Sequence, residues 1–221
     1  MPPDPTYTPA AGRHWLTPFY DFGVAALTRE DRWRSALIAQ VRPRPGDVIV
    51  DVGCGTGSLL VRLGKAAPSA QLIGIDPDPG VLARARKRIA TAGLSVELRT
   101  GFARQAAELL DGRHATKIVS SLVFHQVPME EKVAALAAMC AALGAGGEVH
   151  IADYGLQRTR LMRALFRGLI QNLDGVVNTE PNARGILPDL MCTAGLRSVA
   201  ETLVIPTMSG SISLYRGIRA S

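Results

Sequence analysis

The fold of this chain is decided by the stretch Val48-Ile49-Val50-Asp51-Val52-Gly53-Cys54-Gly55-Thr56-Gly57-Ser58. Its first five residues are apolar apart from Asp51, and their β-branching predicts a strand that is buried on both faces. Alternate glycines follow, where a backbone without Cβ adopts turn conformations closed to other residues and leaves room for a ligand. Apolar residues then predict a helix over about 58–66. A ligand in the turn would therefore lie on the main chain at the positive end of that helix.

The glycine spacing separates two classes of nucleotide-binding turn. A dinucleotide fingerprint requires the pattern G-x-G-x-x-G, in which alanine can replace the last glycine. When the pattern begins at Gly53, its last position is Ser58. A second apolar strand, over 71–76, ends in Asp76, at the roughly 20-residue distance expected of a carboxylate that binds ribose hydroxyls. The two strands predict a site for a cofactor that contains a ribose.

This arrangement resembles class I S-adenosylmethionine-dependent methyltransferases, in particular the small-molecule type of ubiquinone and menaquinone biosynthesis. Lys117–Pro128 is similar to the family's fourth strand and following loop, and Leu143–Tyr154 to its glycine-rich turn into strand five. The resemblance extends from about residue 46 to the end, and implies S-adenosyl-L-methionine as cofactor and S-adenosyl-L-homocysteine as product. The cofactor contacts that it implies are Asp51, Gly53, Cys54, Gly55, Gly57, Asp76, Pro77, Gly101, Phe102, Ala103 and Ser120.

One of these segments departs from the family pattern. Relatives usually carry an acid after the third strand that accepts a hydrogen bond from the adenine amino group, and this chain has Gly101-Phe102-Ala103. Phe102 cannot accept that bond, so the adenine would be held by backbone groups and by apolar or stacking contact.

The order of the expected elements predicts the fold class. Strands are expected at 47–52, 71–76, 96–99, 117–123 and 148–153, and helices at about 58–66, 79–92, 102–110 and 129–143. This alternation predicts an α/β fold with a parallel sheet and helices on both faces. Two strands in the tail, over 198–205 and 211–218, predict an antiparallel closing hairpin, which gives a Rossmann-like, mostly parallel sheet of seven strands.

Helical segments are expected on both sides of this core. Residues 1–45 are predicted to form an N-terminal tail and helical cap, with a helical pattern from Arg13 to about Val41, and residues 46–221 to form the methyltransferase domain. The stretch Arg160–Leu173 has an apolar stripe at helical spacing and an arginine-rich side. It predicts a lid insertion at about 158–184 over an acceptor cavity lined by Met162, Phe166 and Leu169. The alternative is peripheral contact of helix 160–173 with an anionic membrane surface.

Two residues are candidates for catalysis. His125 follows the fourth strand at the carboxyl edge, where open α/β sheets bind ligands, and a neutral imidazole there could take a proton from the acceptor. The alternative is a loop histidine bonded to the backbone. Tyr20 stands where many relatives carry a similar aromatic, and its alternative role is to pack the N-terminal helices on the core, the role that we expect for Trp33. Asp153 and Tyr154 end the fifth strand at the same edge and could line the acceptor pocket.

Composition limits the function further. The 221 residues are 47% hydrophobic and contain no apolar run long enough to span a membrane. The first residues lack the pattern of a signal peptide, so a cytoplasmic protein is expected. The three cysteines are scattered, which predicts neither disulfides nor a metal site.

The acceptor class is less closely defined by the sequence. The formal charge of +6 comes almost entirely from arginine and does not by itself indicate nucleic acid. The segment 120–124 also lacks the Asp/Asn-Pro-Pro-aromatic run of amino-methylating DNA enzymes. We expect transfer of a methyl group to a C, N or O atom of a small molecule, such as a quinone-like compound, a natural product or a lipid head group. The alternatives are a nucleotide-dependent oxidoreductase and a non-catalytic S-adenosylmethionine-binding protein.

Overall fold

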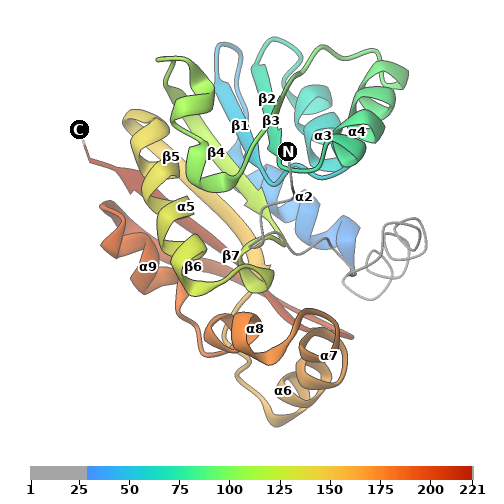
Figure 1. Cartoon of the computed structure of the whole chain (residues 1–221), viewed down its shortest axis with the longest axis vertical. Helices are drawn as coiled ribbons and strands as arrows, with labels where there is room; N and C mark the ends of the chain where they lie inside the picture. The colour runs from blue at the N-terminus through green and yellow to red at the C-terminus, as the bar shows by residue number, and fades with distance from the viewer. Residues whose placement is uncertain (1–28, 221) are drawn as a thin grey trace, which may run out of the picture.

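Seven strands form one sheet in the order β3-β2-β1-β4-β5-β7-β6. The computed structural model describes residues 29–220 (Figure 1). The strands are β1 (Val48–Val52), β2 (Gln71–Asp76), β3 (Glu97–Thr100), β4 (Ala115–Ser121), β5 (Leu143–Tyr154), β6 (Leu196–Thr207) and β7 (Gly210–Arg219). Strands β1 to β5 pair in parallel, and β7 is antiparallel to both β5 and β6. The predicted mostly parallel sheet with a closing hairpin is confirmed.

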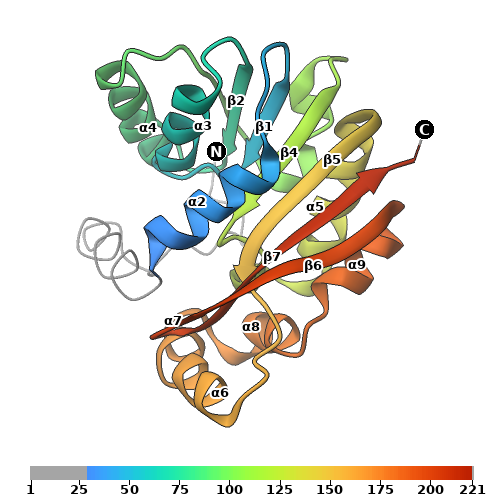
Figure 2. The same cartoon turned by 180° about the vertical axis from the view of Figure 1, so that it is seen from behind.

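Helices cover both faces of the sheet. Figure 2 shows α2 (Glu30–Val41), α3 (Ser58–Ala66) and α4 (Pro79–Thr91) in front of one face. Figure 1 shows α5 (Met129–Ala142) and α9 (Leu187–Thr193) in front of the other. Alternate side chains of β1 pack on opposite faces of the sheet, because neighbouring residues of a strand point in opposite directions.

The two buried clusters follow this alternation. Ile49 joins the cluster of the α2 face, whereas Val50 and Val52 join that of the α5 face. Trp33 of α2 is fully buried in the same cluster as Ile49, in the packing role expected for it. The described part of the N-terminal cap is therefore a helix packed on the sheet. Tyr20 and the rest of the predicted helix lie outside the described residues, and the division of the chain at residue 45 stays a prediction.

The segment expected as a helix over 102–110 differs from that prediction. It forms two short 3-10 turns, η2 (Ala103–Gln105) and η3 (Glu108–Leu110). The Gln105 side chain turns back and accepts a hydrogen bond from the Phe102 N–H at 3.0 Å. Asp111 then ends the second turn with a left-handed backbone, φ 51°. These local bonds compete with the bonds that a continuous helix requires.

The carboxyl end of β4 also differs from the prediction. The strand ends at Ser121 instead of continuing to Val123, because Leu122 takes a left-handed backbone and donates its N–H to Ala152 O at 2.9 Å. The chain then forms the 3-10 turn η4 (Phe124–Gln126). This turn places His125 just beyond the carboxyl end of β4.

Between β5 and α9 the chain forms a helical segment beyond the carboxyl end of β5, at the bottom of both views (Figures 1 and 2). We call residues 158–184 the α6–α8 segment. Its elements are α6 (Arg160–Phe166), the π-helix η5 (Arg167–Gln171), α7 (Asn172–Asp174) and α8 (Val176–Ala183). The predicted helix over 160–173 is therefore present, with a π-helical turn in its middle.

The apolar stripe of this segment has two environments. Phe166 is fully buried, with its ring 5.1 Å from that of Tyr154, so it fills the core instead of lining an open cavity as predicted. Leu161 and Leu173 are exposed. No helix between residues 29 and 220 combines the length and apolar character that crossing a bilayer requires.

Candidate functional site

The glycine turn after β1 is tied to the neighbouring strand. The N–H groups of Gly53 and Cys54 donate to the same oxygen, Ile75 O, at 2.8 and 3.0 Å. Gly53 and Gly57 both have φ of +74°, and Gly55 has φ of +54°, a region that L side chains rarely adopt. A Cβ on Gly53 would lie 2.3 Å from Val123, but one on Gly55 would have no heavy atom within 4 Å. The turn is packed on its inner side and open at Gly55.

Cys54 contributes its backbone to this turn. Its side chain is buried in the cluster of the α2 face, and its Sγ lies 2.9 Å from the position that a Cβ on Gly74 of β2 would take. Burial raises the pKa of the thiol, so the side chain is neutral. A ligand on the turn would therefore meet main-chain atoms of Cys54 and not a thiolate.

Asp76 lies directly beside the turn. Its carboxylate accepts the Gly55 N–H at 2.9 Å and the Asp78 N–H at 3.0 Å. Burial raises its pKa above the ordinary aspartate value, and the two N–H donors partly oppose that effect. Pro77 separates Asp76 from Asp78, whose side chain caps α4 by accepting from Gly80 N and Val81 N. A carboxylate so placed can accept hydrogen bonds from a pair of vicinal hydroxyls.

Asp51 is a buried acid without a hydrogen-bond partner. It is 1% exposed, and neither carboxylate oxygen accepts a hydrogen bond from any residue that the structure describes. Burial raises its pKa to about 7, with a further increase from Asp76, while Arg34 lowers it. Such an orphaned carboxylate is costly unless a ligand donor reaches it.

Arg34 of α2 is a charged residue that interacts electrostatically with Asp51, and the sequence analysis did not name it. Its guanidinium lies 4.9 Å from the centre of the Trp33 ring and its Nε 2.6 Å from Glu30 Oε1. Burial lowers its pKa, and both Glu30 and Asp51 oppose that effect. The positive charge of Arg34 therefore acts on the buried Asp51 carboxylate of β1 and lowers its pKa.

The remaining predicted contacts lie on either side of this centre. Gly101 donates its N–H to Asp76 O at 3.2 Å, and the Arg104 guanidinium lies 4.3 Å from the centre of the Phe102 ring. Ala103 begins the η2 turn that follows. Ser120 is fully buried and donates its hydroxyl to Val52 O at 2.8 Å, so it joins β4 to β1 and its hydroxyl is already engaged.

His125 lies between two carboxylates. Its Nδ1 is 2.8 Å from Asp153 Oδ1, and its Nε2 is 3.4 Å from Asp174 Oδ2. Burial lowers the pKa of the imidazole, but the two carboxylates outweigh that effect and set it at about 9. The ring is therefore an imidazolium at neutral pH, with both nitrogens facing acids. This geometry favours a charged, structural role for His125. Its predicted role as a general base stays a prediction, and a ring that already carries the proton does not favour it.

Asp153 fixes the position of that ring. Its carboxylate accepts the N–H groups of Val123 at 2.9 Å, Phe124 at 2.7 Å and Tyr154 at 2.7 Å in addition to the His125 contact. The Tyr154 hydroxyl is 2.7 Å from Ser209 Oγ, so that side chain is engaged with the hairpin. The two residues build the sheet edge, and neither presents a free polar group to an acceptor.

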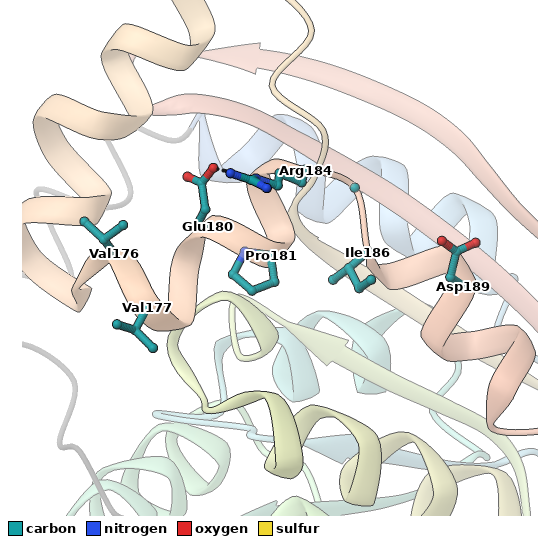
Figure 3. A pocket seen from close by; sticks show the side chains of 8 residues that line it. Val176, Val177, Glu180, Pro181, Arg184, Ile186 and Asp189 are labelled. Carbon is teal, nitrogen blue, oxygen red and sulfur yellow. Dashed lines mark hydrogen bonds and ion pairs between the residues drawn. The ribbon is translucent and has the colours of Figure 1, made fainter.

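A surface groove of about 530 Å³ lies along α8 and the turn into α9 (Figure 3). Val176, Val177 and Pro181 line it together with the ion pair of Glu180 and Arg184. It shares no residue with the glycine turn or with the surroundings of His125. Within residues 29–220, no group of three or more His, Cys, Asp or Glu side chains is placed to hold a metal ion.

Comparison with known proteins defines the class of this site. The model of a methyltransferase domain matches residues 49–147, which contain all of β1 but its first residue, the glycine turn, Asp76 and His125. This part of the chain is a class I methyltransferase domain. An O-methyltransferase family protein from Burkholderia thailandensis has the same fold, with a TM-score of 0.71 and 20% identity over 94% of this chain and 61% of that one.

Two curated relatives show how widely the acceptors of similar domains differ. A demethylmenaquinone methyltransferase from Symbiobacterium thermophilum is 41% identical over 63 residues, which are 28% of this chain and 25% of the relative. A ribosomal RNA small subunit methyltransferase C from Pseudomonas aeruginosa is 34% identical over 106 residues, which are 47% of this chain and 30% of the relative. The chain thus spans less than a third of the length of either relative.

The cofactor of this class is S-adenosylmethionine, and the residues of the methyltransferase domain fit it. The open side of Gly55 leaves space where the ligand backbone would lie. The buried oxygens of Asp51 lack a donor within the described structure, and the ligand's ammonium group would supply one. Asp76 can accept from the ribose, and Arg34 can face the ligand's carboxylate.

Proposed function

We propose that this protein transfers the methyl group of S-adenosylmethionine to a small-molecule acceptor. The observation that supports the proposal best is the pair of unsatisfied Asp51 oxygens beside a glycine turn that is already bonded to Asp76. In this proposal Asp76 binds the ribose, Asp51 the ammonium group, and Arg34 the carboxylate. The backbone at Gly101 and the face of Phe102 hold the adenine.

The bound cofactor supplies a methyl group on a sulfonium, which an oriented nucleophile can attack directly. The protein then contributes mainly alignment and the exclusion of water. The α6–α8 segment would perform the second task, because it lies beyond the carboxyl end of β5. We propose it as the lid over the acceptor, with its partly buried side chains Met162 and Leu169 toward the acceptor and Phe166 anchoring it in the core.

Calorimetry with S-adenosylhomocysteine and with NAD tests the cofactor assignment. S-adenosylhomocysteine should bind the full-length protein, and NAD should show no comparable affinity, because the G-x-G-x-G turn has Ser58 in place of the last glycine or alanine of a dinucleotide site. Tight binding of NAD with no binding of S-adenosylhomocysteine would overturn the proposal.

Removal of the Asp76 carboxylate is expected to weaken that binding. The change Asp76→Ala should cost roughly 1.5–3 kcal/mol of binding free energy, the range for losing a hydrogen bond to a charged group. The exposed residue Glu108 offers a matched control, since Glu108→Ala removes a carboxylate away from the site. A folded Asp76→Ala protein with unchanged affinity would show that the ribose is held elsewhere.

Methylation of RNA is the second candidate, favoured by the similarity of about half of the chain to a ribosomal RNA methyltransferase and by the charge of +6. Transfer of labelled methyl groups can be measured with a panel of phenols, quinols and amines in parallel with structured RNA. We expect incorporation into small acceptors. Incorporation into RNA alone would replace the small-molecule proposal and leave the cofactor assignment intact.

A further inference from the structure

We propose that Asp174 of α7 and His125 of η4 form the contact that holds the α6–α8 segment closed, and that Asp174 is a positioning residue for the acceptor. The effect on the acceptor rests on the proposed function, whereas the closure itself does not. The two side chains come from separate parts of the chain and meet at the carboxyl edge of β4 and β5, with 3.4 Å between His125 Nε2 and Asp174 Oδ2.

Four charged side chains from four elements gather at this point. Asp153 of β5, His125 of η4, Lys132 of α5 and Asp174 of α7 are all at least nine-tenths buried. Two are acids and two are bases, so the cluster is neutral when all four carry their charge. A buried cluster of this kind is stable only while the charges remain balanced.

The α6–α8 segment depends on His125 through Asp174. Asp174 Oδ2 is buried and accepts no hydrogen bond from the residues that the structure describes, so the imidazolium at 3.4 Å is its nearest favourable charge. Asp153 holds the other ring nitrogen at 2.8 Å and fixes the ring in place. Without the positive charge, closure would leave a buried carboxylate opposite a neutral ring, which is costly.

Further bonds show that this part of the segment rests directly on the His125 turn. Lys132 Nζ donates to Phe124 O and, at 3.0 Å, to Asn178 O of α8. The Asn178 side chain donates to Gln126 O at 3.2 Å. The same turn packs on the cofactor side, because Val123 occupies the space where a Cβ of Gly53 would lie. Closure of the segment therefore acts on a turn that contacts the glycine loop.

Titration of the cluster gives closure a pH dependence. The pKa of His125 is about 9, above its ordinary value of 6.5, so the stabilisation that it provides is complete below pH 6.5 and is lost as the pH rises through about 9. Burial lowers the pKa of Lys132 to about 8, and Asp153 opposes that effect. Deprotonation of Lys132 removes the free-energy cost of burying its charge, and the neutral amine still donates hydrogen bonds. Loss of the His125 proton is therefore the event that releases the segment.

Hydrogen exchange of the full-length protein, corrected for the intrinsic rate at each pH, tests whether the contact between His125 and Asp174 holds the α6–α8 segment closed. In Asp174→Asn, the backbone of residues 167–178 should exchange about tenfold faster than in the wild type at neutral pH, as expected for the loss of a contact with a charged group. In the wild type the same peptides should lose protection as the pH rises through about 9. Asp189→Asn, which neutralises an exposed carboxylate of α9, should change neither result.

Kinetics then separate a positioning role from a general loss of structure. Asp174→Asn should raise the KM of the acceptor more than it lowers kcat at saturation, and the affinity for S-adenosylhomocysteine should stay within about twofold of the wild type. Asp174→Glu keeps the charge and should restore much of the protection. Should the asparagine variant not fold, the glutamate variant and the wild-type pH profile still carry the test.

Two results would overturn the inference. One is unchanged exchange of residues 167–178 in a folded Asp174→Asn protein. The other is a Lys132→Met protein in which the protection of these residues no longer changes with pH. The lysine, and not His125, would then be the titrating group. Exchange requires neither acceptor nor turnover, so a protein that fails to bind S-adenosylhomocysteine but shows the predicted exchange would refute the proposed function and leave the contact standing.

Discussion

Replacing Asp51 by asparagine is expected to stabilise the unliganded protein and at the same time to weaken its binding of S-adenosylhomocysteine. The carboxylate is 1% exposed and has no hydrogen-bond donor among the described residues. Burial and the charge of Asp76 raise its pKa to about 7, against the attraction of Arg34. The site therefore holds a charge that is unfavourable until the ligand arrives, which is a common conflict between stability and function.

The sign of the effect follows from linkage. The folded pKa of about 7 lies above the ordinary value of 3.8, so folding becomes less favourable as the pH rises from 3.8 to about 7. Removal of the charge should relieve a cost on the order of 4 kcal/mol at pH values above that range, at about 1.4 kcal/mol for each unit of the difference between the folded pKa of about 7 and the ordinary value of 3.8. Urea unfolding of wild type and Asp51→Asn across this range measures the difference, which should vanish toward low pH.

Ligand binding should respond in the opposite direction. A neutral amide cannot balance the ammonium group of the cofactor, so we expect Asp51→Asn to lose roughly 1.5–3 kcal/mol of affinity. In the wild type, affinity should fall as the pH decreases through about 7, because Asp51 then gains a proton.

Asp47, which immediately precedes the same strand, is a control of opposite sign. Its hydrogen bonds with Lys117 and the Arg44 N–H lower its pKa in spite of burial, so Asp47→Asn should destabilise the fold and leave binding unchanged. A destabilised Asp51→Asn would show that the acid has a partner in the folded protein.

The parts of the fold that the sequence predicted correctly depend on local rules. The strand β1, its glycine turn and α3 follow from apolar periodicity and from backbone angles that favour glycine at Gly53 and Gly57. The predicted start of the helix at residue 79 is confirmed by α4, where the Asp78 side chain caps the first turn. Such features are set by a few neighbouring residues, and one sequence contains them in full.

Features that depend on contacts between distant segments could not be predicted in the same way. Arg34 belongs to no motif, and only the packing of α2 on the sheet brings its charge near Asp51. His125 was expected to be neutral, because the sequence does not show that Asp153 and Asp174 lie on its two sides. Phe166 belongs to the predicted apolar stripe, yet its burial against Tyr154 depends on how α6 meets the hairpin. In each case the residue type was visible and its partner was not.

Alanine at Gly53 and alanine at Gly55 are expected to separate folding from cofactor binding within a single turn. A Cβ on Gly53 would lie 2.3 Å from Val123 Cγ2, and the backbone there has φ of +74°. Val123 cannot easily withdraw, because its N–H is bonded to Asp153 at 2.9 Å. Overpacking costs about 1–3 kcal/mol and the left-handed backbone about 1–2 kcal/mol, so Gly53→Ala should lose roughly 2–5 kcal/mol of stability.

Gly55→Ala meets no neighbour within 4 Å, so only the cost of the left-handed backbone, about 1–2 kcal/mol, should appear in its stability. The added methyl group instead occupies the open side of the turn, where the cofactor would approach the main chain, and calorimetry should show a large loss of affinity for S-adenosylhomocysteine. Urea unfolding of both variants completes the comparison. Equal loss of stability in the two proteins would contradict the packing of Val123 against Gly53. Undiminished binding by Gly55→Ala would mean that the ligand does not lie on this turn, because Gly55 is the glycine of the turn that faces open space.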